Sequence, residues 1–194
     1  SEMCIRDRLR MANTLGEAVI DRHRRRRGRR TRRITIDFDV THDPTHGQQE
    51  LSFYHGFYGA HCYLPLIGTL QFDDEPHQYL YAAVLRSGRS GAAHGLIAIL
   101  RRSFASLRRA FPRARLRVRL DGGFGTPDLL DFLEAEHVEY VVGMPTNVKL
   151  QRLSRRALGR ARRLSRESGE ASQVYGEIAR YQTRRWSHPR RVIY

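Results

Sequence analysis

Cysteine is scarce in this chain of 194 residues: Cys4 and Cys62 are the only two, and they lack the spacing of a zinc ribbon. A disulfide framework is therefore not expected, and a reducing compartment, the cytoplasm, is predicted. Long apolar runs are missing as well, since none approaches the roughly 18 residues that cross a membrane. No signal-peptide pattern opens the chain, so neither a membrane protein nor a secreted one is predicted.

Acidic residues are few and lysine is almost absent, whereas arginine is abundant. Lys149 is the single lysine, and 35 Lys and Arg against 20 Asp and Glu give a formal net charge of +15 at pH 7. This excess favours a polyanionic partner, because Lys and Arg that bind phosphates release condensed counterions. The planar fork of arginine suits bidentate phosphate contacts, although a GC-rich genome produces the same arginine bias. Nucleic acid is the predicted partner class.

The N-terminal segment 1–33 lacks the pattern of a folded domain. Its first eight residues have no apolar period and are interpreted as a sequencing artefact, and the basic run DRHRRRRGRRTRR follows. We expect a disordered basic arm over 1–33. The remaining 34–194 are expected to form one domain, which is long enough to bury a core.

From residue 33 onward, apolar residues recur with periods typical of strands and then of helices. Alternation at period two predicts strands over 34–41, 61–72, 78–88, 113–123, 139–145 (short and buried), 172–183 and 190–194. Spacings of three and four predict helices over 96–111, 126–138 and 147–169. Three strands followed by helix–strand–helix–strand is typical of the α/β class, with a mixed sheet and helices on its faces.

Acidic side chains share one face of the first predicted strand, ITIDFDV. Asp37, Asp39 and Thr41 lie on that face, where carboxylates repel one another unless a positive group lies against them. Asp121 ends a later strand, just before a glycine turn. Because a strand after a crossover helix is often parallel to the first, Asp39 and Asp121 are expected side by side at the carboxyl ends, where ligands of open α/β sheets bind. Two aspartates there suit Mg²⁺ or Mn²⁺.

Five motifs, in order along 34–194, carry a resemblance to a known family: DFDVTHDPTHGQQELSFYHGFYGAHCYLPL, AVLRSG, LDGGF, YVVGMPTN and RRWSHPRRVI. Together they resemble the catalytic core of DDE-type transposases of bacterial insertion sequences. The resemblance implies an RNase H-like fold and metal-dependent cutting of transposon ends with strand transfer into target DNA. It also implies double-stranded DNA as the partner and, for the full-length protein, a homodimer that bridges two ends.

The resemblance assigns roles to particular acids of this chain. The family's first aspartate corresponds to Asp39 and its second to Asp121, with Asp37, one pleat earlier, as the alternative first metal ligand. In such enzymes two divalent ions about 3.5–4 Å apart activate the attacking oxygen and stabilise the leaving one. The third acid, a helix-borne glutamate, is expected beyond Tyr194 after an inserted β-rich segment, since Glu177 lies in a strand-like run. The chain is therefore interpreted as a fragment that is inactive in strand transfer.

Several side chains allow more than one interpretation. The arginine face of helix 147–169 is either a DNA-binding surface or a solvated one: Arg152, Arg155, Arg156, Arg160 and Arg163. The histidines near the first strand suggest zinc, but Pro44 and Gly47 exclude helical spacing for His42 and His46, which favours turn or DNA-backbone contacts. Trp186 is predicted to pack against the sheet rather than to stack on a base. The aromatic residues of the YHGFY motif are predicted to be core: Tyr54, Phe57 and Tyr58.

Two other functions are consistent with the composition. The first is another RNase H-like nuclease, such as a resolvase, which predicts a third carboxylate within this chain and hydrolysis without strand joining. The second is a non-catalytic basic protein that coats nucleic acid. It predicts that Asp39→Ala and Asp121→Ala leave DNA binding and its salt dependence unchanged, and that there is no response to Mg²⁺.

Overall fold

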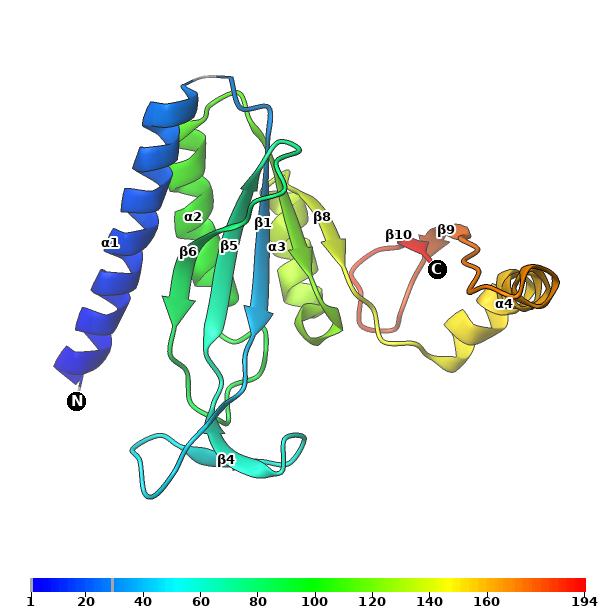
Figure 1. The fold of residues 1–194 in the computed structure, drawn as a ribbon, viewed down its shortest axis with the longest axis horizontal. Helices are drawn as coiled ribbons and strands as arrows, with labels where there is room; N and C mark the ends of the chain where they lie inside the picture. The colour runs from blue at the N-terminus through cyan, green and yellow to red at the C-terminus, as the bar shows by residue number, and fades with distance from the viewer. Residues whose placement is uncertain (1, 29) are drawn as a thin grey trace. The chain divides into compact units, whose positions relative to one another are not determined.

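A computed structural model describes residues 2–28 and 30–194, with side chains described from Asn13 onward apart from residue 29, and it divides the chain into two units, 1–143 and 144–194. The sheet of the first unit has five strands: β1 (Arg33–Val40), β5 (Leu66–Phe72), β6 (Tyr79–Val84), β7 (Arg115–Leu120) and β8 (Glu139–Val142). Their order is β6-β5-β1-β7-β8 (Figure 1). β1–β5 and β5–β6 pair antiparallel, whereas β1–β7 and β7–β8 pair parallel. This is the predicted mixed sheet of the α/β class.

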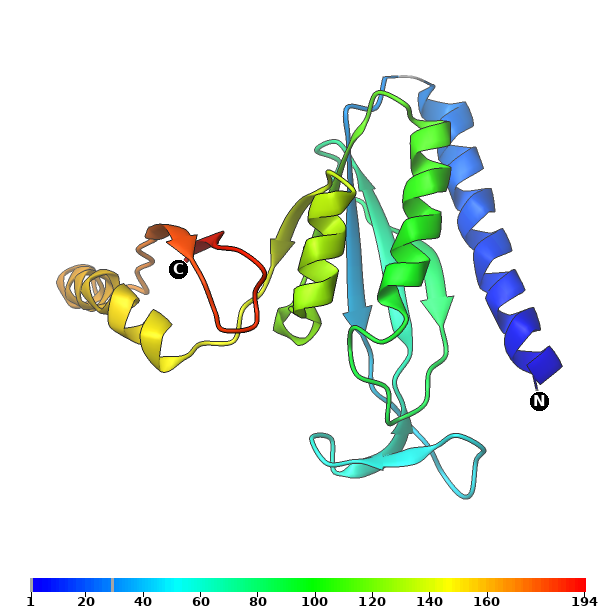
Figure 2. The same cartoon turned by 180° about the vertical axis from the view of Figure 1, so that it is seen from behind.

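The core lies between one face of this sheet and two helices, α2 (Leu96–Ala110) and α3 (Pro127–Ala135), which Figure 2 shows in front of the sheet. Period-two alternation buries Ile34, Ile36 and Phe38 of β1 on this side. The predicted apolar stripe of α2 is confirmed, because its residues at spacings of four and three are fully buried: Leu96, Leu100, Phe104 and Leu107. Thr126 is the N-cap of α3, as predicted, and Pro127 occupies the first helical position.

The edge strand β8 differs from its prediction. It was expected to be buried, but none of its residues is buried and Val141 is 61% exposed. The apolar run EYVV indicates a strand without indicating its place in the sheet. β8 pairs with β7 on one side and with no described strand of this sheet on the other, so it is an edge strand.

The N-terminal segment is helical over most of its length, whereas a disordered arm over 1–33 was predicted. Helix α1 (Glu2–Arg27) packs against β6 and α2. Its buried positions Gly16, Ile20 and His23 recur at spacings of four and three. A Cβ on Gly16 would lie 2.9 Å from the Tyr81 carbonyl oxygen, so a small residue allows this close approach. The basic run hides this stripe, because arginines fill the solvent face and the last turn of the same helix.

The end of α1 is fixed by contacts with the sheet and with the turn after β5. The Arg27 guanidinium pairs with Glu75 and lies 4.7 Å from the centroid of the Phe72 ring. The His23 ring stacks on Phe72 at 4.7 Å and lies 4.2 Å from Tyr79. Burial, reinforced by the neighbouring Arg27 charge, lowers the pKa of His23 below its ordinary value.

This lowered pKa predicts a pH-dependent stability. Between the folded-state pKa and the unfolded value of about 6.5, the unfolded chain binds more protons at His23 than the folded one. The free energy of unfolding should therefore fall as the pH drops below about 6.5 and recover above it. Urea unfolding across this range should show a flatter profile for His23→Phe, whereas the exposed control His46→Phe should keep the wild-type profile. Equal slopes for wild type and His23→Phe would contradict the prediction.

A small second sheet is inserted between β1 and β5, at the carboxyl end of β1 (Figure 1). Its strands are β2 (Asp43–Pro44), β3 (Phe53–His55) and β4 (Ala60–Tyr63), in the order β2-β4-β3. The strand predicted over 61–72 is thus two strands, β4 and β5, separated at Pro65, which has no N–H for a ladder. The prediction that its aromatic residues are core is wrong, since Tyr54 and Phe57 are 59% and 85% exposed and Tyr58 is exposed as well.

The second unit consists of helix α4 (Val148–Ser168) and a hairpin of β9 (Glu177–Tyr181) and β10 (Arg190–Ile193). The Asn147 side chain caps α4 by accepting a hydrogen bond from the Leu150 N–H at 3.0 Å. Leu150, Tyr181 and Val192 form its small core, and Trp186 packs against this cluster. Among residues 2–28 and 30–194, no helix combines the length and apolarity that crossing a bilayer requires.

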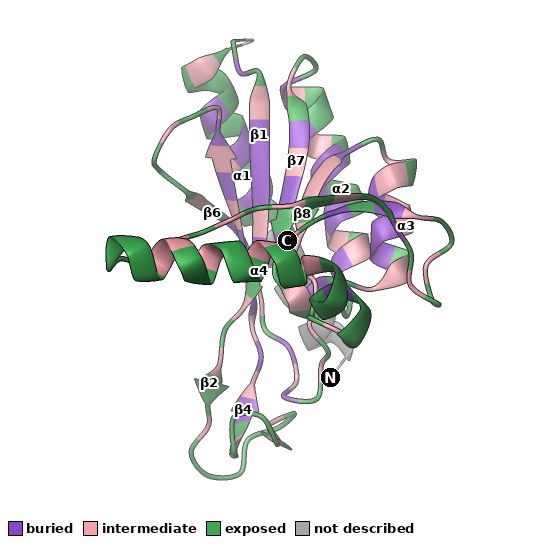
Figure 3. Cartoon of the chain, turned by 90° about the vertical axis from the view of Figure 1, so that its right-hand side faces the viewer, coloured by how far each residue is buried: buried purple, intermediate pink, exposed green. Residues whose placement is uncertain are grey.

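The prediction that an apolar stripe of α4 faces inward is mostly wrong. Only Leu150, in the first turn, is buried, and Leu153 is 40% exposed. Figure 3 shows the rest of the helix coloured as exposed or intermediate. The spacing of the leucines and alanines identifies an amphipathic helix correctly, but the second unit packs only against its first turn.

Candidate active site

Asp39 and Asp121 lie at neighbouring ends of two parallel strands. β1 and β7 pair in parallel, and the last registered pair is Phe38 with Leu120. The next residue on each strand is an aspartate, and neighbouring strands lie about 4.8 Å apart. Asp121 retains an extended backbone (φ −77°, ψ −179°). The two aspartates selected from the sequence are therefore brought to adjacent positions at the carboxyl ends of these two strands.

An ion pair shows which face these aspartates share. Asp37 and Arg119 are register partners on β1 and β7. Arg119 Nε donates to Asp37 Oδ1 at 2.7 Å, and Arg119 Nη2 donates to Oδ2 at 2.8 Å. Because side chains alternate along a strand, Asp39 and Asp121, each two positions further, project from this same face.

The same ion pair distinguishes Asp37 from Asp39. Both carboxylate oxygens of Asp37 accept from Arg119, and Gln78 Nε2 donates to Oδ2 at 3.4 Å. The hydrogen bond with Asp37 raises the pKa of Arg119 above its ordinary value. The sequence analysis expected a positive group to lie against the acidic face of β1. Arg119 is that group. Asp39, by contrast, is exposed, and among the described residues its Oδ1 accepts the Val40 N–H at 2.8 Å.

The turn after β7 holds Asp121 in place. Its Oδ1 accepts the Gly123 N–H at 2.8 Å, at the start of a 3-10 helix over Gly122–Phe124 whose last residue, Phe124, is fully buried. The Gly143 N–H donates to the Leu120 carbonyl at 2.9 Å. A Cβ on Gly143 would lie 2.7 Å from the Gly122 nitrogen, so glycine is needed for this close approach.

A buried arginine organises the loop between β6 and α2 at the same sheet edge. Arg86 is 8% exposed, and its Nε donates to the Leu64 carbonyl at 3.0 Å. Its Nη1 donates to three carbonyls of the loop at 2.9–3.2 Å: Gly91, Ala92 and His94. Burial lowers the pKa of Arg86 from its ordinary value. The loop reaches the Asp121 turn, because a Cβ on Gly123 would lie 3.2 Å from the Ala92 Cβ.

Sequence reasoning missed the roles of Arg119 and Arg86, although both lie in recognisable patterns. Arg119 alternates with buried residues in RLRVRL, directly before Asp121. Arg86 is the arginine of AVLRSG, one of the motifs that carry the family resemblance. The alternation marks the face of Arg119, but only the register of β1 and β7 identifies its partner.

The predicted DNA-binding arginines lie on α4 in the second unit. All five are exposed: Arg152, Arg155, Arg156, Arg160 and Arg163. Figure 3 shows most of this helix in the colour of exposed residues. The Arg163 Nε lies 3.7 Å from a carboxylate oxygen of Glu167, one turn on. In the same unit, Glu177 of β9 pairs with Arg191 of β10 at 2.9 Å, and this hydrogen bond lowers the pKa of Glu177.

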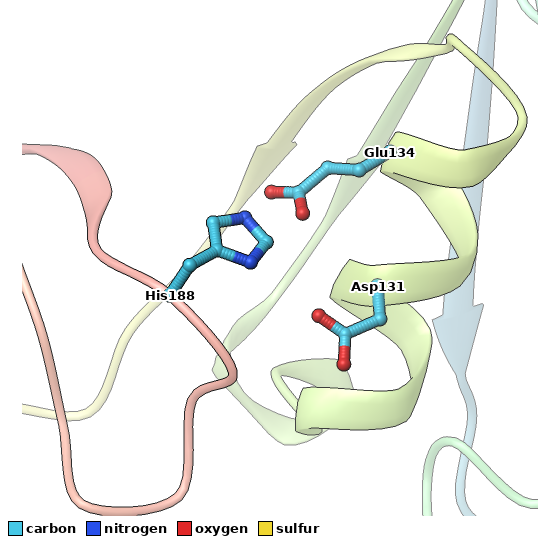
Figure 4. A group of neighbouring side chains, drawn as sticks. All are labelled: Asp131, Glu134 and His188. Carbon is cyan, nitrogen blue, oxygen red and sulfur yellow. The ribbon is translucent and has the colours of Figure 1, made fainter.

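Other groups with metal-binding side chains are also described. Asp131 and Glu134 lie one turn apart on α3, and Figure 4 draws both side chains on the same side of the helix. The Tyr140 hydroxyl donates to Glu134 Oε1 at 2.5 Å. His188, drawn in the same figure, belongs to the second unit. Two acids one turn apart are common on helix surfaces, and this pair carries no assignment of chemistry.

Two of the histidines near the first strand, His42 and His61, make aromatic contacts. His42 stacks on Tyr58 with a centroid separation of 4.3 Å, and His61 lies 5.6 Å from Tyr54. Cys62 is buried, and burial raises the pKa of its thiol.

Comparison with known proteins identifies relatives of the chain. A family model described as transposase DDE domain group 1 matches residues 2–194. Among solved structures, the Mos1 transposase paired-end complex with the left transposon end is 15% identical, with a TM-score of 0.35 over 87% of this chain and 50% of that chain. The Mos1 strand transfer complex is 14% identical, with a TM-score of 0.33 over 92% and 50%. This chain therefore spans about half the length of those proteins. A comparison with curated proteins gave no match.

Proposed function

Since the chain belongs to the family of transposase DDE domains, group 1, we propose that it carries part of a metal-dependent centre that cuts and transfers DNA strands at the ends of an insertion sequence. The observation that supports this most directly is the parallel register that puts Asp39 and Asp121 side by side on one face. The whole transposase, and a homodimer of it that bridges two DNA ends, belong to the same proposal.

The two carboxylates fit a hard divalent cation, Mg²⁺ or Mn²⁺. Both side chains are exposed, and in each the hydrogen bond to a backbone N–H uses Oδ1. Within the part of the chain that the structure describes, neither carboxylate forms a salt bridge with an arginine. Carboxylate oxygens are the ligands that these cations prefer. Asp37 is a weaker candidate, because Arg119 binds both of its oxygens.

The chain's own residues position the two acids for this chemistry. Bound divalent cations would activate the attacking oxygen and stabilise the leaving one. Asp39 is held by its strand, and Asp121 by the glycine turn and by the loop that Arg86 organises. We assign the family's third acid to no residue here, since Glu177 is paired with Arg191.

The DNA itself is proposed to contact the basic face of α4. The helix carries seven arginines and Lys149 against one acid, Glu167. Exposed guanidinium groups bind phosphates in bidentate fashion and release counterions, so this contact should be strongly salt-dependent and independent of sequence. Arg152, Arg155, Arg156, Arg160 and Arg163 are the residues proposed to make it.

Titration of Mn²⁺ into the chain tests the proposed centre. Asp39→Asn and Asp121→Asn should each weaken Mn²⁺ binding by at least ~10-fold, since removing even a residue that only supports a metal ligand costs about that much. Asp74→Asn is the matched control, because Asp74 follows β5 at the opposite end of the sheet. Unchanged Mn²⁺ affinity in both site variants would favour a non-catalytic nucleic-acid-binding protein.

A further inference from the structure

An exposed aromatic surface follows the strand that carries Asp39. We call Phe53–Tyr63, which comprises β3, its turn and β4, the aromatic hairpin. Phe57 in its turn is 85% exposed, and Tyr54 is 59% exposed. The turn is built by the backbone, since the His55 carbonyl accepts the N–H groups of Tyr58 and Gly59 at 3.1 and 2.9 Å. The ring of Phe57 is therefore not needed to form the hairpin.

The exposed rings of the hairpin form two groups of contacting rings. Phe57 and Tyr58 lie edge to face at 5.0 Å, and His42 stacks on the Tyr58 ring at an interplanar angle of 9°. Tyr54 and His61 are register partners on β3 and β4 and lie edge to face. A single exposed aromatic needs no explanation, whereas a cluster of them marks an interaction site.

The aromatic hairpin lies at the sheet edge that carries Asp39 and Asp121. The Thr41 N–H, just after β1, donates to the Pro65 carbonyl, just before β5, at 3.0 Å. The loop organised by Arg86 packs directly on the hairpin, because a Cβ on Gly88 would lie 2.2 Å from the Cys62 carbonyl oxygen. This loop also reaches the Asp121 turn through Ala92. The same loop thus contacts both the hairpin and the proposed metal centre.

Charge and size indicate what kind of partner fits. Asp43 and Glu50 precede the hairpin, and an exposed arginine, Arg89, lies over the Phe53 ring at 4.1 Å. This balance does not favour phosphate contacts, so a partner must be recognised through its flat surface. At about 150–250 Å² for a whole aromatic side chain, the exposed parts of Tyr54, Phe57 and Tyr58 amount to a few hundred Å². This is less than the roughly 800 Å² per partner that a stable protein interface buries. Unstacked nucleobases match both conditions, because every base offers a π-face.

We propose that the aromatic hairpin binds unpaired nucleotides of a DNA strand by stacking on Phe57 and Tyr54, next to the Asp39–Asp121 centre. The inference rests on the proposed function, since cutting at that centre releases a strand end beside the hairpin. β4 has four residues and is roughly 13 Å long, which corresponds to about four nucleotides at 3.4 Å each. The contact would hold the released strand without adding to the electrostatic affinity.

Fluorescence anisotropy without divalent cations tests this with two kinds of probe. One is a blunt duplex, and the other is the same duplex extended by five unpaired nucleotides on one strand, made once with a 3′ and once with a 5′ extension. Wild type should bind one extended probe more tightly, by about 5- to 100-fold. Phe57→Leu, which keeps an apolar side chain but removes the ring, should lose most of this difference and leave blunt-duplex affinity unchanged. Phe57→Trp should retain the difference. The slope of log affinity against log salt should be the same in all three proteins.

The α4 variant Arg156→Gln separates this inference from the proposed function. It should weaken the binding of blunt and extended probes by the same factor. It should also reduce the slope of log affinity against log salt by about one. Failure to bind the blunt duplex would count against the DNA contact of the proposed function. Equal affinity of wild type for blunt and extended probes, or a full advantage retained by Phe57→Leu, would overturn the stacking role alone. A change in oligomeric state of Phe57→Leu would overturn it too, by assigning the surface to a second copy of the chain.

Discussion

In the whole transposase, replacing Asp121 by asparagine is expected to lower Mn²⁺-dependent nicking of supercoiled plasmid by about 10²–10³-fold, with a similar loss for Asp39→Asn. Asparagine keeps the size of the side chain and a carbonyl oxygen that can still accept the Gly123 N–H, so the turn should survive. What is lost is the negative charge that holds a cation at the sheet edge. The relaxed-circle fraction, followed over time at fixed Mn²⁺, measures the effect.

Asp37→Asn supplies the sharpest comparison, because Asp37 shares the strand and the face. Arg119 already neutralises its carboxylate, so nicking should fall by less than ~10-fold, and Arg119→Gln should give a similar, small loss. If Asp37→Asn abolished nicking while Asp39→Asn did not, Asp37 would be the first metal ligand. Equal nicking by wild type and Asp121→Asn would remove the catalytic role proposed for this edge.

Arg86→Met should lower the free energy of unfolding by about 3 kcal/mol or more. The side chain is almost fully buried and donates to four backbone carbonyls. A methionine of similar length would remove this donor from all four, although the Gly91 carbonyl would keep the His94 N–H at 3.0 Å. The variant also no longer has to bury a charged guanidinium, and this saving limits the loss of stability. Urea unfolding monitored by circular dichroism gives the value.

Arg89→Met is the matched control for this loss. Arg89 lies three residues further along the same loop, is exposed, and contacts only the face of Phe53 among described rings. Its replacement should cost less than about 1 kcal/mol. If Arg86→Met unfolded no more easily than Arg89→Met, the loop would have to be held by something other than the buried guanidinium.

The sequence predicted the main elements of the first unit because their signals are local. Burial on one side of a helix or strand leaves a period of 3.6 or 2 in neighbouring residues, as in the stripe of α2 and the alternation of β1. The same signal became ambiguous where only one turn or one edge is packed. α4 and β8 therefore have the predicted type but not the predicted burial.

The N-terminal helix and the aromatic hairpin show a different limit of the sequence. The stripe of α1 includes a glycine and a histidine, which count as apolar only once β6 and Phe72 are known to lie against them. Phe57 and Tyr54 are residue types common in protein cores, but here they lie exposed on a hairpin. The hydrophobicity of a side chain determines the free energy gained when it is buried. It does not determine whether a neighbouring element is present to bury it.

From the amino-acid order alone we predicted the α/β class, which the sheet confirms, together with a polyanionic partner and the metal-ligand pair Asp39 and Asp121, which stay predictions. Each depends on composition, on local period or on a motif. The pairing of β1 with β7 then decided which acid meets an arginine: Asp37 and Arg119 are 82 positions apart, and no local pattern connects them. Side chains so distant in the chain come together only through strand register, which is a property of the folded sheet.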